Sequence, residues 1–174
     1  MVPVYQSEHW KNYTGSFIDN NYLIEFLTPK EYFEFIAKIY GMSRSDLYKR
    51  LESYDHFFNI KIPETSKYLR QLSSGEKQRA GIISALLSNP EVLILDEPFN
   101  FLDPSSQILL KNILIHAFQY KTKTIILSSH NLNHISEICT RVVLMEKGVI
   151  VKDLQNTRET MSEIDSYFKN QIND

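Results

Sequence analysis

The sequence lacks the features that mark a secreted, membrane-spanning or nucleic-acid-binding protein. It contains one cysteine, so no internal disulfide can form. Its apolar stretches are short, and none approaches the roughly 18 residues that a membrane-spanning helix needs. The net charge of -2 offers no general attraction to nucleic acids or anionic membranes. The first residues have neither the basic start nor the apolar centre of a secretory signal. We therefore expect a cytoplasmic chain with no nucleic-acid partner.

Glycine is also scarce, and its placement excludes a phosphate-binding loop. The chain has five glycines, and none of them is followed by lysine. The P-loop motif GxxxxGK[ST] requires that pair, because its backbone N–H groups surround the β-phosphate while the lysine neutralises the β and γ charges. These 174 residues therefore contain no Walker A motif.

The first half of the chain has a helical pattern. The 174 residues, of which 43% are hydrophobic, suffice for one domain with a substantial core. Thr28-Pro29-Lys30-Glu31 has the spacing of a capping box with proline at the first helical position, and apolar residues then recur at helical spacing up to Gly41. We expect a second helix from Ser43 towards Tyr54 and a connecting segment over residues 57–72.

From Ser73 onward, predicted helices alternate with short β-rich segments. We expect helices over 73–88, 104–118 and 132–139, and strands over 92–95 and 124–128. This βαβ order predicts an α/β fold with a parallel sheet and helices on its faces. Residues 141–145 and 149–153 are expected to form a hairpin at the edge of that sheet, followed by a helix after Thr157.

Two adjacent carboxylates, Asp96 and Glu97, follow the apolar strand 92–95. Ligand sites in open α/β sheets lie just past the carboxyl ends of such strands. Adjacent residues on an extended strand point to opposite sides, so one carboxylate can hold Mg²⁺ through water while the other positions an attacking water. The alternative is an acidic turn that only caps the strand.

Two further polar features have a structural and a functional interpretation. Ser73-Ser74-Gly75-Glu76 opens a helix, whose free N–H groups can bind an anion or can simply be satisfied by a capping box. His130 follows the strand over 124–128, where a lone histidine serves either a structural or a catalytic role. Neither feature decides the function alone.

Taken together, these segments resemble the nucleotide-binding subunit of ABC (ATP-binding cassette) ATPases over nearly the whole chain. LSSGEKQR, from Leu72, resembles the signature motif, with Ser74 where glycine is usual. LILDEP, from Leu93, resembles Walker B, and the segment 100–104 resembles the D-loop. His130 occupies the switch-histidine position. Residues 15–41 resemble the Q-loop and the entry to the helical subdomain, with Asp19 where glutamine or glutamate is usual.

The resemblance implies a P-loop NTPase-type parallel sheet with a helical subdomain, missing its N-terminal P-loop portion. Residues 27–72 would form the helical subdomain. Residues 73–153 would form the core that carries the signature, Walker B, D-loop and switch histidine. Residues 154–174 would form a C-terminal helix.

The resemblance also implies ATP and Mg²⁺ as cofactors and assigns roles around them. Asp96 would bind Mg²⁺ through water, and Asp19 would line the metal and water site. Glu97 would polarise the hydrolytic water, and His130 would contact the γ-phosphate.

In the family, nucleotide sites form between two cassettes. Ser73, Gly75 and Glu76 would belong to the site for ATP held by the opposite subunit, and Asp103 would couple the two sites of the dimer. The expected partners are therefore a second ABC ATPase subunit and a transmembrane permease, which would hold the chain at the membrane. The aromatic-rich segment 26–58 would carry the permease docking surface, although an amphipathic core explains the same aromatics.

The missing Walker A motif leaves three interpretations open. The first is the C-terminal part of a longer ABC transporter ATPase, which could not hydrolyse ATP alone. The second is a non-catalytic module that completes or regulates a full cassette through its signature helix. The third is a soluble ABC protein of chromosome maintenance or translation, which would call for a coiled-coil insertion or a second cassette, and the sequence has neither.

Overall fold

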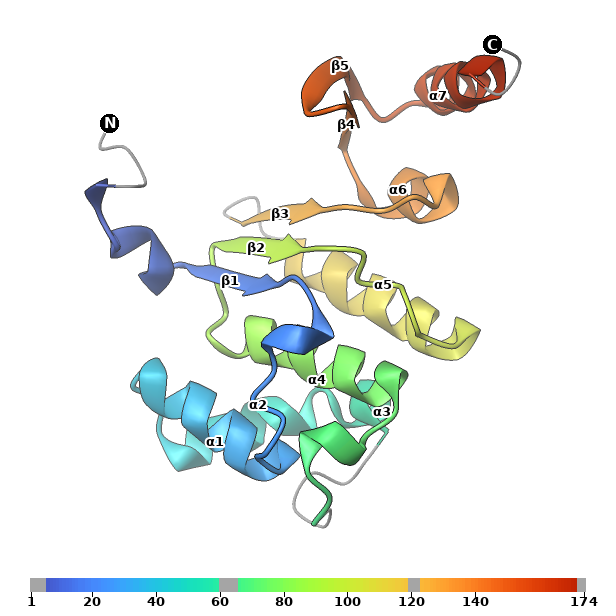
Figure 1. Ribbon diagram of the computed structural model, residues 1–174. Helices are drawn as coiled ribbons and strands as arrows, with labels where there is room; N and C mark the ends of the chain where they lie inside the picture. The colour runs from blue at the N-terminus through green and yellow to red at the C-terminus, as the bar shows by residue number, and fades with distance from the viewer. Residues whose placement is uncertain (1–5, 60–65, 119–122, 172–174) are drawn as a thin grey trace. The chain divides into compact units, whose positions relative to one another are not determined.

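The computed structural model describes residues 6–59, 66–118 and 123–171 and contains two compact units, Met1–Ser128 and Ser129–Asp174. The first unit holds a three-stranded sheet and the second a two-stranded sheet, each with helices. The prediction of an α/β fold with a parallel sheet is confirmed (Figure 1).

The sheet of the first unit has the order β1-β2-β3, with all strands parallel. Its strands are β1 (Thr14–Phe17), β2 (Val92–Leu95) and β3 (Thr124–Leu127), and the last residues of all three are register partners. The carboxyl ends of the strands therefore finish level at one edge of the sheet (Figure 1). The sequence pattern predicted β2 and β3, but it did not predict β1.

Five α-helices belong to the described part of the first unit. They are α1 (Pro29–Ile39), α2 (Arg44–Glu52), α3 (Asp55–Phe58), α4 (Ser74–Leu87) and α5 (Pro104–Phe118). Three short 3-10 helices lie at His9–Asn12, Asn20–Tyr22 and Leu69–Gln71. Figure 1 shows α4 and α5 on one side of the sheet, with α1 and α2 beyond α4.

The predicted helix starts agree with the structure. Thr28 caps α1 with a complete capping box, and Gly41, with a φ of +64°, follows its end. The second predicted helix stops at Glu52, and a separate short helix, α3, follows it. Part of the predicted connection, residues 60–65, lies outside the described residues.

Helix α4 is the centre of the first unit. Nine of its residues are buried, including Ile82, Ile83 and Leu87, which have no exposed surface. Such a helix packs on more than one side, and each fully buried aliphatic side chain contributes about 1.5–3 kcal/mol. A Cβ at Gly81 would lie 2.1 Å from the ring of Phe17, so the absence of a side chain there lets β1 approach α4.

The second unit contains α6 (Leu132–Ile138), β4 (Arg141–Glu146), β5 (Val149–Gln155) and α7 (Arg158–Gln171). The predicted hairpin and C-terminal helix are confirmed. Among the described residues β4 and β5 pair with each other in a two-stranded sheet, and the position of the hairpin at the edge of the parallel sheet stays a prediction. Burial of Val142 and Ile164 stabilises this unit.

Candidate nucleotide site

The polar residues that follow the three parallel strands lie at one edge of the sheet. The backbone ladder continues one residue past the strands, because Asp96 N–H donates to the Phe17 carbonyl and Ser128 N–H donates to the Leu95 carbonyl, both at 3.0 Å. Asp96 and Ser128 are therefore neighbours across the sheet. This edge is where open α/β sheets bind ligands.

Ser128 connects the two acidic residues of the Walker B segment. Its hydroxyl donates to a carboxylate oxygen of Asp96, and its Oγ accepts from the Glu97 backbone N–H at 2.8 Å. The sequence pattern predicts Ser128 only as the end of a strand. The available signal was its position directly after an apolar strand, which is where the acidic pair also stands.

The backbone of Glu97 has an uncommon conformation. Its φ is +42°, in the left-handed region that is rare for a long side chain. Side chains hold both of its backbone polar groups: Ser128 accepts from the N–H, and Nε2 of Gln78 on α4 donates to the carbonyl at 3.2 Å. Glu97 is half-buried, whereas Asp96 is exposed.

Asp19 is engaged in local structure at the end of β1. It caps the 3-10 helix Asn20–Tyr22, and its carboxylate accepts from the Asn21 N–H at 2.7 Å. Its side chain is exposed. These contacts are those of a cap, so the metal role of Asp19 stays a prediction.

The donor set at the sheet edge suits a hard cation with a largely water-filled coordination shell. Among the described residues, no group of three or more His, Cys, Asp or Glu side chains is placed to hold a metal ion. Asp96 and Ser128 supply oxygen atoms next to each other. Mg²⁺ takes one or two protein oxygens and fills the remaining positions with water and phosphate oxygens, and these residues fit that pattern.

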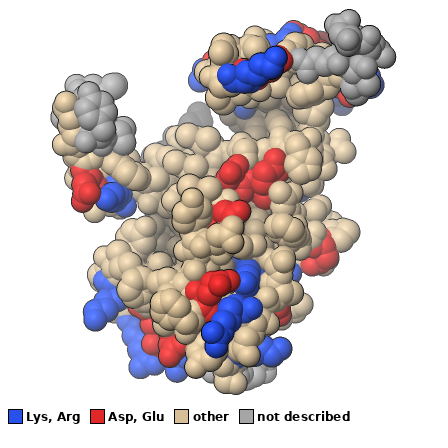
Figure 2. All heavy atoms as spheres, viewed as in Figure 1, with Lys and Arg blue, Asp and Glu red and all other residues tan. Residues whose placement is uncertain are grey.

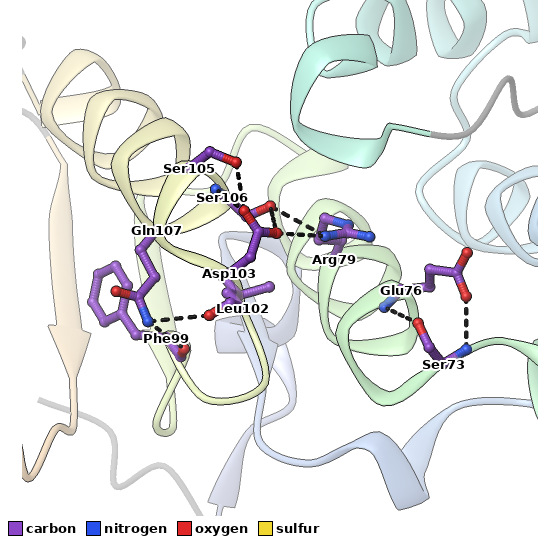
Figure 3. Close-up of polar contacts among 9 residues, drawn as sticks. All are labelled: Ser73, Glu76, Arg79, Phe99, Leu102, Asp103, Ser105, Ser106 and Gln107. Atoms are coloured by element: carbon purple, nitrogen blue, oxygen red, sulfur yellow. Dashed lines mark hydrogen bonds and ion pairs between the residues drawn. The ribbon is translucent and has the colours of Figure 1, made fainter.

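The start of α4 is a complete capping box. Ser73 Oγ accepts from the Glu76 N–H at 3.3 Å, and the Glu76 carboxylate accepts from the Ser73 N–H at 2.6 Å (Figure 3). The capping interpretation is confirmed, and the predicted nucleotide contacts of Ser73, Gly75 and Glu76 stay predictions. Ser73 is exposed at the first turn of a helix 14 residues long, where the helix dipole favours an anion.

Asp103 caps the start of α5. Its carboxylate accepts from the Ser106 N–H at 3.0 Å and from the hydroxyls of Ser105 and Ser106, as Figure 3 shows. These hydrogen bonds hold the pKa of Asp103 well below its usual range, and the bond from the Ser105 hydroxyl has the largest effect. Arg79 on α4 lies 3.6 Å from the same carboxylate.

His130 follows β3 by three residues and belongs to the second unit, where its side chain is exposed. The structure thus brings Asp96, Glu97 and the unpredicted Ser128 together within the first unit. The role of His130 stays a prediction.

The first unit also has a hollow that lies away from Asp96, Glu97 and Ser128. It is an apolar cavity of about 520 Å³ between α4, α5 and the sheet, and its lining includes Leu93, Ile113, His116 and Ile125. None of the predicted site residues lines it. The polar edge of the sheet and the apolar cavity are therefore separate features.

The visible surface has no single large patch of one charge. Figure 2 shows small groups of basic and acidic side chains next to each other on this face, with other residues between them. Within the described residues, no helix is both long and apolar enough to span a membrane.

Comparisons with known proteins point to one family. A family model described as "AAA domain, putative AbiEii toxin, Type IV TA system" matches residues 9–136. The chain is 34% identical over 140 residues to "Uncharacterized ABC transporter ATP-binding protein YhaQ" of Bacillus subtilis (strain 168), covering 80% of this chain and 46% of that protein. It is 35% identical over 150 residues to "Methionine import ATP-binding protein MetN 3" of Bacillus anthracis, covering 84% and 44%.

Solved structures share the fold. "Structure of ATP binding subunit of ABC transporter" aligns with a TM-score of 0.79 and 26% identity over 88% of this chain and 64% of that one. The cassette MJ0796, solved as a dimer bound to ADP and Pi, aligns with a TM-score of 0.71 and 23% identity over 82% and 62%. The chain spans a little under half the length of the two curated relatives. It belongs to the AAA domain family that the matching model describes and to the ABC ATPase cassettes that these relatives represent.

Proposed function

We propose that the chain supplies the signature, Walker B, D-loop and switch-histidine portion of an ABC transporter ATPase, and that it does not hydrolyse ATP alone. The observation that carries this proposal is the Asp96–Ser128–Glu97 cluster at the carboxyl edge of a parallel sheet. It supports the proposal because ligand sites in open α/β sheets lie at this edge, and here two adjacent carboxylates stand there in a chain without a GK[ST] phosphate loop.

The two carboxylates take different roles in this proposal. Asp96, exposed and adjacent to the Ser128 hydroxyl, holds Mg²⁺ through water. Glu97 has both backbone groups fixed, which orients its carboxylate to position the attacking water. His130 contacts the γ-phosphate, and Asp19 lines the same site. ATP is bound only when a phosphate loop is supplied, because backbone N–H groups must surround the β-phosphate.

The start of α4 acts across a dimer. Ser73 and Gly75 lie at the exposed, positive end of a long helix, where a phosphate held by another cassette is favoured. Glu76 stabilises this turn through the capping box with Ser73. Asp103 couples the two nucleotide sites of the dimer. The same surface would also serve the alternative function, in which this chain is a non-catalytic module that completes or regulates a full cassette.

A membrane permease is the proposed partner for the helical part of the first unit. Large apolar side chains are exposed there, with exposed fractions of 76% for Tyr22, 71% for Phe26, 44% for Phe35 and 62% for Ile39. Three of these side chains are aromatic, a residue type that is enriched at protein contacts. Transport of a substrate by that permease would be driven by ATP-dependent closure of the cassette dimer.

The proposal is tested by titrating Mg-ATP against the purified chain, alone and after an N-terminal strand, phosphate loop and helix are fused to it. We expect no turnover by the chain alone and turnover by the fused protein. In the fused protein, Glu97→Gln should abolish turnover and leave ATP binding unchanged, because only the water-positioning group is lost.

Glu91→Gln is the matched control, since Glu91 is exposed at the opposite end of β2 and should leave turnover unchanged. Turnover by the unaltered chain, with micromolar ATP affinity, would overturn the proposal. Retention of full turnover by the Glu97→Gln fused protein would overturn the role of Glu97.

A further inference from the structure

One face of α4 contacts the segment from Glu97 to Asp103 at its beginning, middle and end. Gly75, Gln78 and Arg79 are spaced by three and four residues, so they lie on the same side of the helix. Each of them contacts the loop that joins β2 to α5. This group of three residues is called the clamp face below.

Gln78 reaches the beginning of the loop. Its side chain is 4% exposed, and its Nε2 donates to the carbonyl oxygen of Glu97 at 3.2 Å. A buried amide costs free energy unless it is hydrogen bonded, so this contact fixes the position of the Glu97 backbone.

Arg79 reaches the end of the same loop. Its Nη1 donates to Ser106 Oγ at 3.1 Å and lies 3.6 Å from the Asp103 carboxylate, and only 11% of its side chain is exposed (Figure 3). Its Nε is buried and has no hydrogen-bond partner among the described residues. The Asp103 side chain is 53% exposed and the ion pair is long, so the pair adds little stability and mainly fixes the position of the two side chains.

Gly75 touches the middle of the loop. A Cβ at this position would lie 2.7 Å from the carbonyl oxygen of Phe101, closer than real Cβ contacts. Phe101 itself has a φ of +62° and is 68% exposed. Glycine at position 75 therefore allows the loop to pack directly against the first turn of α4.

The loop holds two bulky residues in the left-handed region, Glu97 at +42° and Phe101 at +62°. Such conformations persist only where the surrounding structure fixes them. The clamp face supplies contacts beside both residues, and Gln107 adds hydrogen bonds to the carbonyls of Phe99 and Leu102 at 3.4 and 3.2 Å.

We propose that Gln78 and Arg79 are positioning residues that join the signature turn, Glu97 and Asp103 into one rigid unit. This inference rests on the proposed function, in which Ser73 to Glu76 serve the partner's nucleotide and Glu97 serves the nucleotide of its own cassette. Displacement of the first turn of α4 would then displace Glu97 and the D-loop with it. Gly75 is required for loop packing as well as for phosphate approach.

The test is hydrogen–deuterium exchange of the purified chain, followed by mass spectrometry in the absence of ATP. The probe peptide covers residues 98–106, which include the Asn100 and Leu102 amides that donate to the carbonyls of Glu97 and Phe99. We expect Arg79→Met and Gln78→Leu each to raise exchange in this peptide about tenfold, because local opening becomes easier. A peptide from α1 should be unchanged.

Lys77→Met is the matched control for Arg79→Met. It removes the same charge from the same helix, but Lys77 pairs with Glu25 at 2.7 Å and not with the loop. Arg79→Lys should restore part of the protection, because it keeps the charge near Asp103 without the planar fork. Equal exchange in Arg79→Met and Lys77→Met would overturn the inference.

A second pair of variants applies if a substitution of Gln78 or Arg79 unfolds the chain. Gly75→Ala adds one methyl group against the Phe101 carbonyl, whereas Ser74→Ala alters an exposed neighbour. Raised exchange in Gly75→Ala alone supports the clamp face, and equal exchange in both opposes it.

In the phosphate-loop fusion, Arg79→Met should lower turnover severalfold without changing ATP affinity, while Lys77→Met should change neither. Equal turnover in these two variants would overturn the positioning role. The exchange experiment needs no ATP and no partner. Unchanged exchange would therefore overturn the positioning role without affecting the proposed function, and absence of turnover in the fusion would overturn the proposed function without affecting the exchange result.

Discussion

Replacing Ser128 with alanine should loosen the turn that carries the acidic pair. The substitution removes the acceptor for the Glu97 N–H at 2.8 Å and the donor to the Asp96 carboxylate. A neutral hydrogen bond contributes about 0.5–1.5 kcal/mol net. The bond to Asp96 contributes no more than that, because this carboxylate is exposed and water replaces the lost donor. We therefore expect the free energy of unfolding to fall by about 1–2 kcal/mol.

The measurement is urea unfolding followed by tryptophan fluorescence. The chain has one tryptophan, Trp10, and it lies in the first unit with Ser128, so the signal reports the unit that carries the substitution. The midpoint should shift while the denaturant slope stays constant, since the surface exposed on unfolding is unchanged.

Ser45→Ala is the control, because Ser45 is exposed and lies in the same unit as Ser128 and Trp10. Its effect should be smaller than about 0.5 kcal/mol, as for an exposed surface change. Equal stability of Ser128→Ala and Ser45→Ala would refute this prediction, since Ser128 would then contribute nothing to the turn.

Three further substitutions test the surrounding framework. Asp103→Asn should destabilise the chain above the unfolded pKa of about 3.9. The difference should shrink progressively as pH falls below that value towards the lowered folded pKa, because the hydrogen bonds stabilise only the ionised carboxylate. Urea titrations between pH 7 and pH 2.5 measure the onset of this loss. Tyr32→Phe should cost about 1 kcal/mol by removing a buried hydrogen bond of 3.2 Å to Ser84. Gly81→Ala should cost about 1–3 kcal/mol, because its Cβ would lie 2.1 Å from the Phe17 ring. Thermal denaturation measures the last two.

The first two of these have a matched control. Asp165→Asn removes a carboxylate whose side chain is 51% exposed and whose partner, Lys169, is 70% exposed, so its effect on stability at pH 7 should be small. Tyr22→Phe removes a hydroxyl from a side chain that is 76% exposed and should be neutral. A pH-independent loss in Asp103→Asn, or a Gly81→Ala variant as stable as the parent chain, would contradict the assignments.

Local rules account for the elements that were predicted correctly. The capping boxes at Thr28 and Ser73 are fixed by side chains three residues apart, and the structure contains both. The apolar strand Val92–Leu95 and the helix Pro104–Phe118 have the predicted bounds. In each case the signal lies within a few adjacent residues, so it can be read without knowledge of the fold.

Strand β1 shows where local rules stop. Thr14-Gly15-Ser16-Phe17 has a single large apolar residue, and its extended form is set by pairing with β2, which is remote in sequence. Strand pairing depends on long-range contacts that a local pattern does not contain.

The sequence by itself determined the chemistry of this protein: the acidic pair at Asp96, the signature-like helix start and the absence of a GK[ST] loop. These are properties of residue type and order. Only the tertiary structure decided how they are held. It placed the Ser128 hydroxyl between the Asp96 carboxylate and the Glu97 backbone N–H, and it joined Gln78 and Arg79 to the two ends of one loop. Hydrogen bonds between distant segments require the strands and helices to be packed first, and packing is decided by the whole chain.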